Sequence, residues 1–274
     1  MKASVVRSVS AGALALVCAV PALAETVIGV TRPFRDATLS AAVPGAVVEV
    51  TVKPGAAVKK GDVLVRLDSR LEELEVARRR QQAESQVEIE AAKARVATLK
   101  TDLDGTRRLF ETTQSVSKDD LDKKELEFRL AEAELSQLAV AEERERIECE
   151  MAEAQLEKRA VRAPFDGIVT RVEIEEGEVC GPERPLLRLV DVTSVYFTAS
   201  LDARLTPGLS LGQELAVRVE NDGDPLGRVG TVEFISPVVD AASGLQDIRV
   251  RFANPDGRVR PGLSATVELG ATPQ

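Results

Sequence analysis

The chain has 274 residues, with 36 basic and 45 acidic side chains and a formal net charge of -9. This acidic balance excludes nucleic acid as an expected partner, because affinity for phosphates depends on clustered lysine and arginine. The chain contains no histidine, which removes both the commonest metal ligand and the commonest general base. We therefore expect no catalytic site, no cofactor and no metal site.

Residues 1–24 have the pattern of a secretory signal peptide. Lys2 and Arg7 form a basic start, residues 11–23 are apolar, and the small residues Ala22 and Ala24 precede the expected cleavage point. This apolar stretch is shorter than the roughly 20 residues that a membrane-spanning helix needs, and no later segment approaches that length. We expect export to the periplasm, with no transmembrane helix after cleavage.

One short motif occurs twice, at residues 41–55 and 163–177, with a constant offset of 122 positions. The matched positions continue beyond it and include Val47 with Val169, Gly55 with Gly177, Leu64 with Leu186 and Leu67 with Leu189. Alternating apolar residues and Gly or Pro turns predict three or four short strands per copy, too few for a stable sheet alone. We expect two half-motifs, 41–68 and 161–192, to form one small β-sandwich, preceded by an N-terminal strand or extension over 25–40.

Residues 69–160, between the two copies, have a helical composition. They contain no proline and one glycine, Gly105, and are rich in Ala, Glu, Leu, Arg and Gln. The periodicity breaks near Ser115, and Ser117 is placed to cap a second helix whose first turn is acidic. We predict two antiparallel helices of about 42 residues each, a hairpin roughly 60 Å long, which brings Asp68 and Val161 together.

Apolar residues recur with heptad spacing along both arms, which is typical of a coiled coil. The expected seam residues are Ile89, Ala92, Val96, Leu99, Leu103 and Phe110 on the first arm, and Leu121, Phe128, Ala131, Leu135, Leu138, Cys149, Ala152 and Leu156 on the second. Glu142 and Glu145 also fall on the seam, which predicts a loosened, hydrated section there. Ion pairs of the favourable i,i+4 orientation are expected on the arms: Glu75 with Arg79, Glu125 with Arg129, and Glu142 with Arg146.

Residues 193–270 contain five or six short strands separated by Gly, Pro, Asn and Asp turns. Short strands at regular spacing predict a small β-barrel. Residues 201–209 are expected to add one helical turn, and residues 271–274 form a tail.

The order half-motif, helical hairpin, half-motif and barrel resembles the periplasmic adaptor subunits of tripartite efflux pumps, the membrane fusion protein family with HlyD-type and resistance-nodulation-division (RND) adaptors. The segments 163–169, APFDGIV, and 232–269 carry the resemblance. It implies a mixed β and α fold. In this fold an antiparallel α-helical coiled-coil hairpin is inserted into a split biotinyl/lipoyl-like β-sandwich, and a small β-barrel follows.

The resemblance also implies a function. The protein would be a non-catalytic periplasmic adaptor linking an inner-membrane transporter to a TolC-type outer-membrane channel for the export of small molecules. An RND transporter is favoured, and an ABC exporter is the alternative. The chain would associate with the inner membrane through the pump complex and assemble as a homo-oligomer, a trimer or hexamer.

The hairpin tip is the expected contact with the channel. Family members that dock on TolC-type channels carry an arginine, a leucine four residues on and a serine seven beyond that. Ser117 matches the serine, whereas Phe110 replaces the leucine and Thr106 the arginine, with Arg107 and Arg108 displaced. A plain helix cap is the alternative role for Ser117. The resemblance implies these tip contact residues: Arg108, Phe110, Val116, Ser117, Leu121 and Asp122.

The family often has a fourth, membrane-proximal domain built from both termini. Only residues 25–40 lie between the expected cleavage point and the first half-motif, and the sequence stops at Gln274. We therefore expect this domain to be absent or reduced to a strand or two.

Three other functions share part of the pattern. A biotin or lipoyl carrier has the sandwich, but its modified lysine lies on a tight turn between half-motifs, whereas Lys118, Lys123 and Lys124 lie near the far end of a long hairpin. A hydrolase would need a nucleophile with a nearby base, and none is evident. A secreted coiled-coil scaffold or chaperone would share the hairpin but has no need for the sandwich and barrel.

Overall fold

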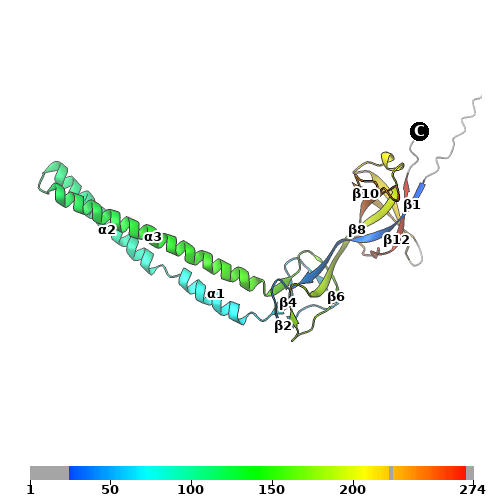
Figure 1. The fold of residues 1–274 in the computed structure, drawn as a ribbon, viewed down its shortest axis with the longest axis horizontal. Coiled ribbons are helices and arrows are strands. Elements are labelled where there is room, and N and C mark those ends of the chain that lie inside the picture. Colours follow the sequence, from blue (N-terminus) through cyan, green and yellow to red (C-terminus); the bar gives the residue numbers. More distant parts are fainter. Residues whose placement is uncertain (1–24, 222–224, 270–274) are drawn as a thin grey trace, which may run out of the picture. The chain divides into compact units, whose positions relative to one another are not determined.

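The computed structural model describes residues 25–221 and 225–269. The expected signal peptide, 1–24, and the tail, 271–274, lie outside the described residues. The described chain forms two compact units, one of residues 25–34 and 192–269 and the other of residues 35–191. Two long strands, β1 (Glu25–Ser40) and β8 (Pro185–Asp202), contribute residues to both units (Figure 1).

The unit of residues 35–191 contains the split sandwich. Its strands recur at the offset of 122 positions: β2 (Gly45–Val50) corresponds to β6 (Gly167–Val172), β3 (Ala57–Val58) to β7 (Val179–Cys180), and β4 (Val63–Leu67) to the start of β8. Strands of one copy pair with strands of the other, because β2 is antiparallel to β7 and β3 to β6. The two half-motifs are therefore one structure.

Equivalent residues of the two copies build the core of the sandwich. Val47 and Val169 are 2% and 0% exposed, and the leucine pairs Leu64 with Leu186 and Leu67 with Leu189 are buried beside them. Each buried leucine or valine contributes about 1.5–3 kcal/mol. The turns repeat as well, since Gly55 and Gly177 have φ angles of +90° and +87°, a left-handed conformation that glycine adopts at no steric cost.

Three helices are inserted between β4 and β5 (Ala160–Arg162): α1 (Arg70–Ala83), α2 (Val87–Thr112) and α3 (Lys118–Glu157). α3 packs against both α2 and α1 (Figure 1). The insertion starts and ends at neighbouring points, because Val65 lies opposite Val161 and the Leu67 N–H donates to the Arg159 carbonyl at 2.8 Å. The prediction of two helices is wrong for the first arm, which is interrupted at residues 84–86.

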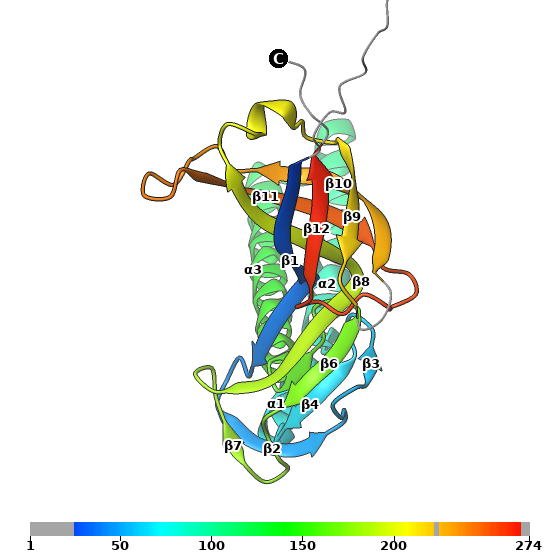
Figure 2. The same ribbon diagram turned by 90° about the vertical axis from the view of Figure 1, so that its right-hand side faces the viewer.

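The other unit is a β-barrel of six strands within the described residues. The strand order is β1-β12-β9-β10-β11-β8, and pairing of β1 with β8 closes the barrel (Figure 2). Its remaining elements are a single turn of 3-10 helix at Thr206–Gly208 and the strands β9 (Glu214–Val219), β10 (Leu226–Ile235), β11 (Leu245–Ala253) and β12 (Ser264–Leu269). The first barrel strand thus comes from the segment expected to be an N-terminal strand or extension, residues 25–40.

Inward-facing residues alternate along the barrel strands, as half-buried strands require. Phe197, Val217 and Val250 are 0–1% exposed and belong to one core cluster. Gly29 on β1 lies against this core, because a Cβ atom at Gly29 would lie 2.7 Å from the ring of Phe197. The same Cβ would lie 2.4 Å from the Thr198 carbonyl oxygen, so a glycine is needed there both for the close approach of the β8 backbone and for the Phe197 ring.

Candidate functional site at the helical hairpin

The arms of the hairpin meet along the predicted seam. Ile89, Ala92 and Leu103 on α2 are buried, as are Ala131 and Cys149 on α3. The remaining apolar seam positions are half-buried. Burial therefore follows the heptad positions expected from the sequence.

Ion pairs link the arms along their length: Arg79 with Glu148, Arg80 with Glu153, Arg95 with Glu134 at 2.8 Å, and Arg107 with Glu125 at 2.9 Å. Each such pair contributes about 0–1 kcal/mol at an exposed surface. Their main effect is on the alignment of the helices, because the partners of Arg80, Arg95 and Arg107 on the first arm are Glu153, Glu134 and Glu125 on the second, in falling order. This arrangement is that of an antiparallel hairpin.

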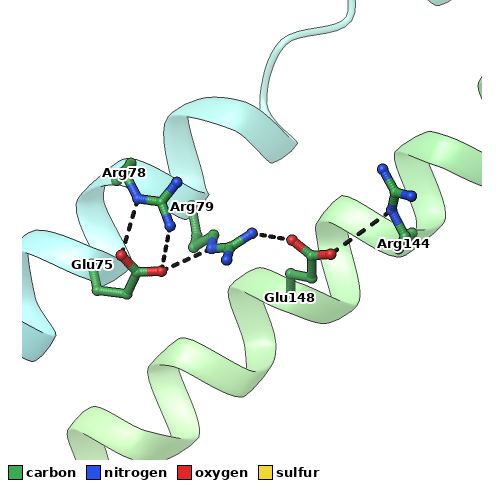
Figure 3. A network of polar contacts seen from close by, with 5 residues as sticks. All are labelled: Glu75, Arg78, Arg79, Arg144 and Glu148. Carbon is green, nitrogen blue, oxygen red and sulfur yellow. Dashed lines mark hydrogen bonds and ion pairs between the residues drawn. The ribbon is translucent and has the colours of Figure 1, made fainter.

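A polar network joins α1 to α3 (Figure 3). Arg78 and Arg79 both donate to the Glu75 carboxylate, at 2.6 and 2.8 Å. Arg79 also pairs with Glu148, whose other oxygen lies 3.8 Å from Arg144. The hydrogen bond from Arg78, followed by that from Arg79, lowers the pKa of Glu75 to about 2. Because α1 has one buried residue, Val76, charged contacts contribute much of its attachment to α3.

The interruption of the first arm lies opposite the two seam glutamates. Arg79 pairs with Glu148 and Arg95 with Glu134, so residues 84–86 face the part of α3 that carries Glu142 and Glu145. Both glutamates are half-buried. Because α3 offers glutamates there in place of apolar side chains, the first arm gains little packing energy from a continuous helix at residues 84–86. This explains why the section that was expected to be loosened contains the break.

Two of the three expected i,i+4 ion pairs form. Glu75 pairs with Arg79 at 2.8 Å, and Glu125 with Arg129 at 4.0 Å. The prediction that Arg146 pairs with Glu142 is wrong, because Arg146 instead contacts residues on its own exposed face, Glu143 and Glu150.

Residues 113–117 form the turn at the hairpin tip. Gln114 has φ = +48°, a left-handed conformation that is uncommon outside glycine. The Ser117 hydroxyl accepts a hydrogen bond from the Asp120 N–H at 3.2 Å and donates to the Asp120 carboxylate at 2.6 Å. Ser117 is therefore the N-cap of α3, as predicted. The pKa of Asp120 is lowered, first by the hydrogen bond from Ser117 and also by the charge of Lys123.

The other predicted tip residues lie at the same end of the hairpin but do not form one polar cluster. Phe110, Val116 and Leu121 are half-buried, whereas Arg108 and Asp122 are exposed. The Arg108 Nε donates to the Asp104 carbonyl at 3.2 Å, so this side chain lies back along α2. No hydrogen bond or ion pair between described residues joins Arg108 to Asp122.

Sequence reasoning missed one apolar residue near the tip. Leu109 is 48% exposed and precedes the seam residue Phe110. The sequence did carry a signal for it, because an apolar residue outside the heptad pattern and close to the turn is expected to be exposed. Leu109 adds apolar surface to an end of the hairpin that already carries the half-buried Val116 and Leu121.

The described residues offer little for other kinds of site. Among residues 25–221 and 225–269, no group of three or more Cys, Asp or Glu side chains is arranged to hold a metal ion. No described helix combines the length and apolar character needed to cross a membrane.

Both units match known domain families. The family model for the CzcB-like barrel-sandwich hybrid domain matches residues 35–191, and that for the CusB-like β-barrel domain matches residues 195–273. The chain is similar to the nodulation protein NolF of Rhizobium meliloti, with 28% identity over 89% of this chain and 62% of NolF. It is also similar to the cobalt-zinc-cadmium resistance protein CzcB of Cupriavidus metallidurans, with 24% identity over 82% of this chain and 40% of CzcB.

A solved structure supports the same fold. The crystal structure of MacA from Actinobacillus actinomycetemcomitans superposes with a TM-score of 0.63 at 18% identity, covering 90% of this chain and 78% of MacA. The chain spans roughly half the length of the curated relatives that it matches.

Proposed function

We propose a function from the fact that this chain belongs to the CzcB-like barrel-sandwich hybrid family, whose members include membrane fusion adaptors of efflux pumps. The protein is a non-catalytic periplasmic adaptor. It links an inner-membrane transporter to a TolC-type outer-membrane channel, so that small molecules leave the cell across both membranes. The observation that carries this proposal is the long helical hairpin inserted into a split sandwich and followed by a barrel.

The hairpin suits a protein that must reach a distant partner. α3 has 40 residues, which corresponds to roughly 60 Å at about 1.5 Å per residue. The two arms form a coiled coil along the buried seam, and ion pairs on their surfaces keep them solvated and aligned. A hairpin of this build presents its tip far from its own sandwich.

The tip is the part that docks on the channel. The seam ends there, so Val116 and Leu121 are only partly buried by the hairpin itself. With the exposed Leu109, they offer apolar surface to a partner, while Ser117 fixes the start of α3. Arg108, Phe110 and Asp122 border this surface.

An RND transporter is the favoured partner in the inner membrane. The match of residues 195–273 to the CusB-like barrel, a barrel class designated for RND systems, supports this choice over an ABC exporter. The cargo class is small molecules, because the names of the relatives include both cobalt-zinc-cadmium resistance and nodulation and define no narrower class. Several copies, three or six, surround the transporter.

Crosslinking in cells tests the proposal without knowledge of the substrate. An affinity-tagged chain is crosslinked in its host, purified and analysed by mass spectrometry, beside a variant in which a short turn replaces residues 69–158. We expect the wild-type chain to recover both an inner-membrane transporter and an outer-membrane channel, and the variant to recover the transporter alone. Recovery of neither partner by the wild type, or of the channel by the variant, contradicts the proposal.

A further inference from the structure

The side chains that α1 shields from solvent are mainly charged. The least exposed positions of this helix are Glu72, Glu75, Val76, Arg79 and Ala83. Val76 is the buried residue of α1, whereas its two leucines, Leu71 and Leu74, are 78% and 62% exposed. The seam positions of α2 are apolar, and three of them are buried. Apolar packing therefore holds α1 to α3 less firmly than it holds α2.

Ion pairs supply the rest of the attachment of α1. They join Arg79 to Glu148, Arg80 to Glu153, and Arg159, which follows α3, to Glu72. The first pair belongs to the network of Figure 3. The paired side chains are 16% to 56% exposed, and ion pairs in contact with water are weakened by salt. The attachment of α1 therefore depends on ionic strength.

The break at residues 84–86 separates α1 from α2. All three residues are exposed, and the helix ends on one side of them and starts again on the other. Helix formation is cooperative only along a continuous helix, so a break lets α1 open without α2. α1 has 14 residues, a length at which an isolated helix is marginal in water. Its helical structure therefore depends on its contacts with α3.

α1 lies over a buried thiol. Cys149 is 9% exposed and lies on α3 between Glu148 and Glu153, the two residues of α3 that pair with α1. The charge of Arg80 acts on Cys149, which places the two side chains near each other. The other described cysteine, Cys180, is 4% exposed in the core of the sandwich. Opening of α1 would therefore expose Cys149 and leave Cys180 buried.

We propose that α1 is a strap over Cys149, held by ion pairs, which opens at residues 84–86 when salt weakens those pairs, while the seam between α2 and α3 stays closed. An open strap leaves α3 alone to join the sandwich to the rest of the hairpin. The hairpin then yields at its root without loosening the end that carries the tip. A strap held by apolar packing would respond in the opposite way, because salts excluded from the protein surface favour apolar burial.

Thiol labelling of the purified protein tests the strap without any substitution. N-ethylmaleimide is added at about 0.1 M or about 1 M NaCl, a change that shortens the Debye length from about 10 Å to about 3 Å. Mass spectrometry of peptides gives the labelling rates of Cys149 and Cys180, each divided by the rate of glutathione in the same buffer. We expect the rate at Cys149 to rise at least about threefold with salt and that at Cys180 to stay unchanged. A rate at Cys149 that does not rise, or a parallel rise at Cys180, overturns the proposal.

Two matched substitutions separate the ion pairs of the strap from ion pairs elsewhere on the hairpin. Arg80→Gln removes the pair with Glu153 and should raise the labelling rate of Cys149 in low salt at least about twofold. Loss of the Arg80 charge by itself would make a nearby thiol less reactive, so a faster rate reports opening. The control Arg95→Gln removes the pair of α2 with Glu134, where the arginine is 63% exposed against 56% for Arg80. It should leave the rate unchanged, and equal rates for the two variants overturn the proposal.

A third thiol distinguishes opening of the strap from melting of the whole hairpin. Ala131 is 3% exposed on α3, close to Glu134, which pairs with Arg95 of α2. In Ala131→Cys the new thiol reports on the seam between α2 and α3. We expect it to react at least about tenfold more slowly than Cys149, because the seam opens less often than the strap. Equal rates at the two positions would show that the hairpin melts as one unit and would overturn the proposal.

Hydrogen exchange of the wild type makes the same comparison if the new cysteine disturbs the seam. Amides of residues 74–83 should exchange faster than those in the middle of α2, and their exchange should accelerate more with salt. Uniform exchange along the first arm overturns the proposal.

Discussion

Removal of the hairpin should leave the rest of the protein folded. The core cluster of the sandwich contains residues of the two half-motifs and none from the helices. Replacing residues 69–158 removes the ion pair of Arg159 with Glu72, whose side chains are exposed to 21% and 16%, and the anchoring of α1 at the sandwich. A partly exposed ion pair and one or two hydrogen bonds amount to about 1–3 kcal/mol. A shorter connection between β4 and β5 does not raise the entropic cost of closing it.

The excision is tested by thermal unfolding followed by far-ultraviolet circular dichroism. A short turn containing Asn-Gly joins Asp68 to Arg159, which keeps the hydrogen bond from the Leu67 N–H to the Arg159 carbonyl. We expect a soluble β protein with a cooperative transition, lowered by no more than about 10 °C for a domain of this size. A variant that aggregates or melts without cooperativity would refute the account of one sandwich interrupted by an independent insertion.

Three other predictions concern the hairpin and the barrel. Leu103→Ala, at a seam position 5% exposed, should lower the free energy of unfolding of the hairpin by about 2–3 kcal/mol. Leu109→Ala, at a site 48% exposed, should change this free energy by less than about 0.5 kcal/mol. Both free energies are measured by urea titration, and equal losses for the two variants would contradict the assignment of Leu103 to the seam. The pKa of Glu75 falls from 4.5 to about 2 on folding, so its stabilisation is complete above about pH 4.5 and is lost as the pH falls towards 2. Between pH 4.5 and 2 the melting temperature should fall more steeply with pH in the wild type than in Glu75→Gln. Parallel plots of melting temperature against pH would show that the Arg78 and Arg79 contacts do not stabilise the fold. Gly29→Ala should lower the melting temperature of the barrel by crowding the Thr198 carbonyl and the Phe197 ring, at a cost of about 1–3 kcal/mol. An unchanged melting temperature would refute the close packing at β1.

The sequence patterns that predicted the fold are the regularly spaced ones, namely the repeated motif and the heptads. The repeat at 122 positions predicted equivalent strands, and the heptads predicted which residues of α2 and α3 are buried, because both patterns follow from which face of an element meets a core. The break at residues 84–86 was not predicted. Glu84 and Gln86 favour helix locally and Ser85 disfavours it only weakly. The break arises from the lack of apolar partners across the seam, which only the alignment of the two arms reveals.

The candidate sites divide in the same way. The role of Ser117 as a helix cap could be predicted, because capping depends on a serine and the next three residues. The strap could not, since the ion pairs that hold α1 join residues 69 to 87 positions apart, and the sequence leaves their alignment open. The contribution of β1 to the barrel was missed for the same reason, because residues 25–30 pair with β12 far along the chain.

The docking of the tip on an outer-membrane channel is the central claim. Its most direct test is the double variant Val116→Asp, Ser117→Arg, compared with Ala97→Asp, Thr98→Arg, which places the same charges on exposed positions of α2. Loss of the cap costs about 1 kcal/mol, a similar order to the helix propensity lost in the control, so both variants should melt at similar temperatures. A buried, unpaired charge at a docked tip should cost several kcal/mol of binding.

The measurement is the amount of channel recovered with the tagged chain after crosslinking in cells, relative to the transporter recovered with it. The account predicts at least a tenfold loss of channel for the tip variant and no loss for the control, with transporter recovery unchanged in both. Channel recovery by the tip variant at the wild-type level would contradict docking through the tip.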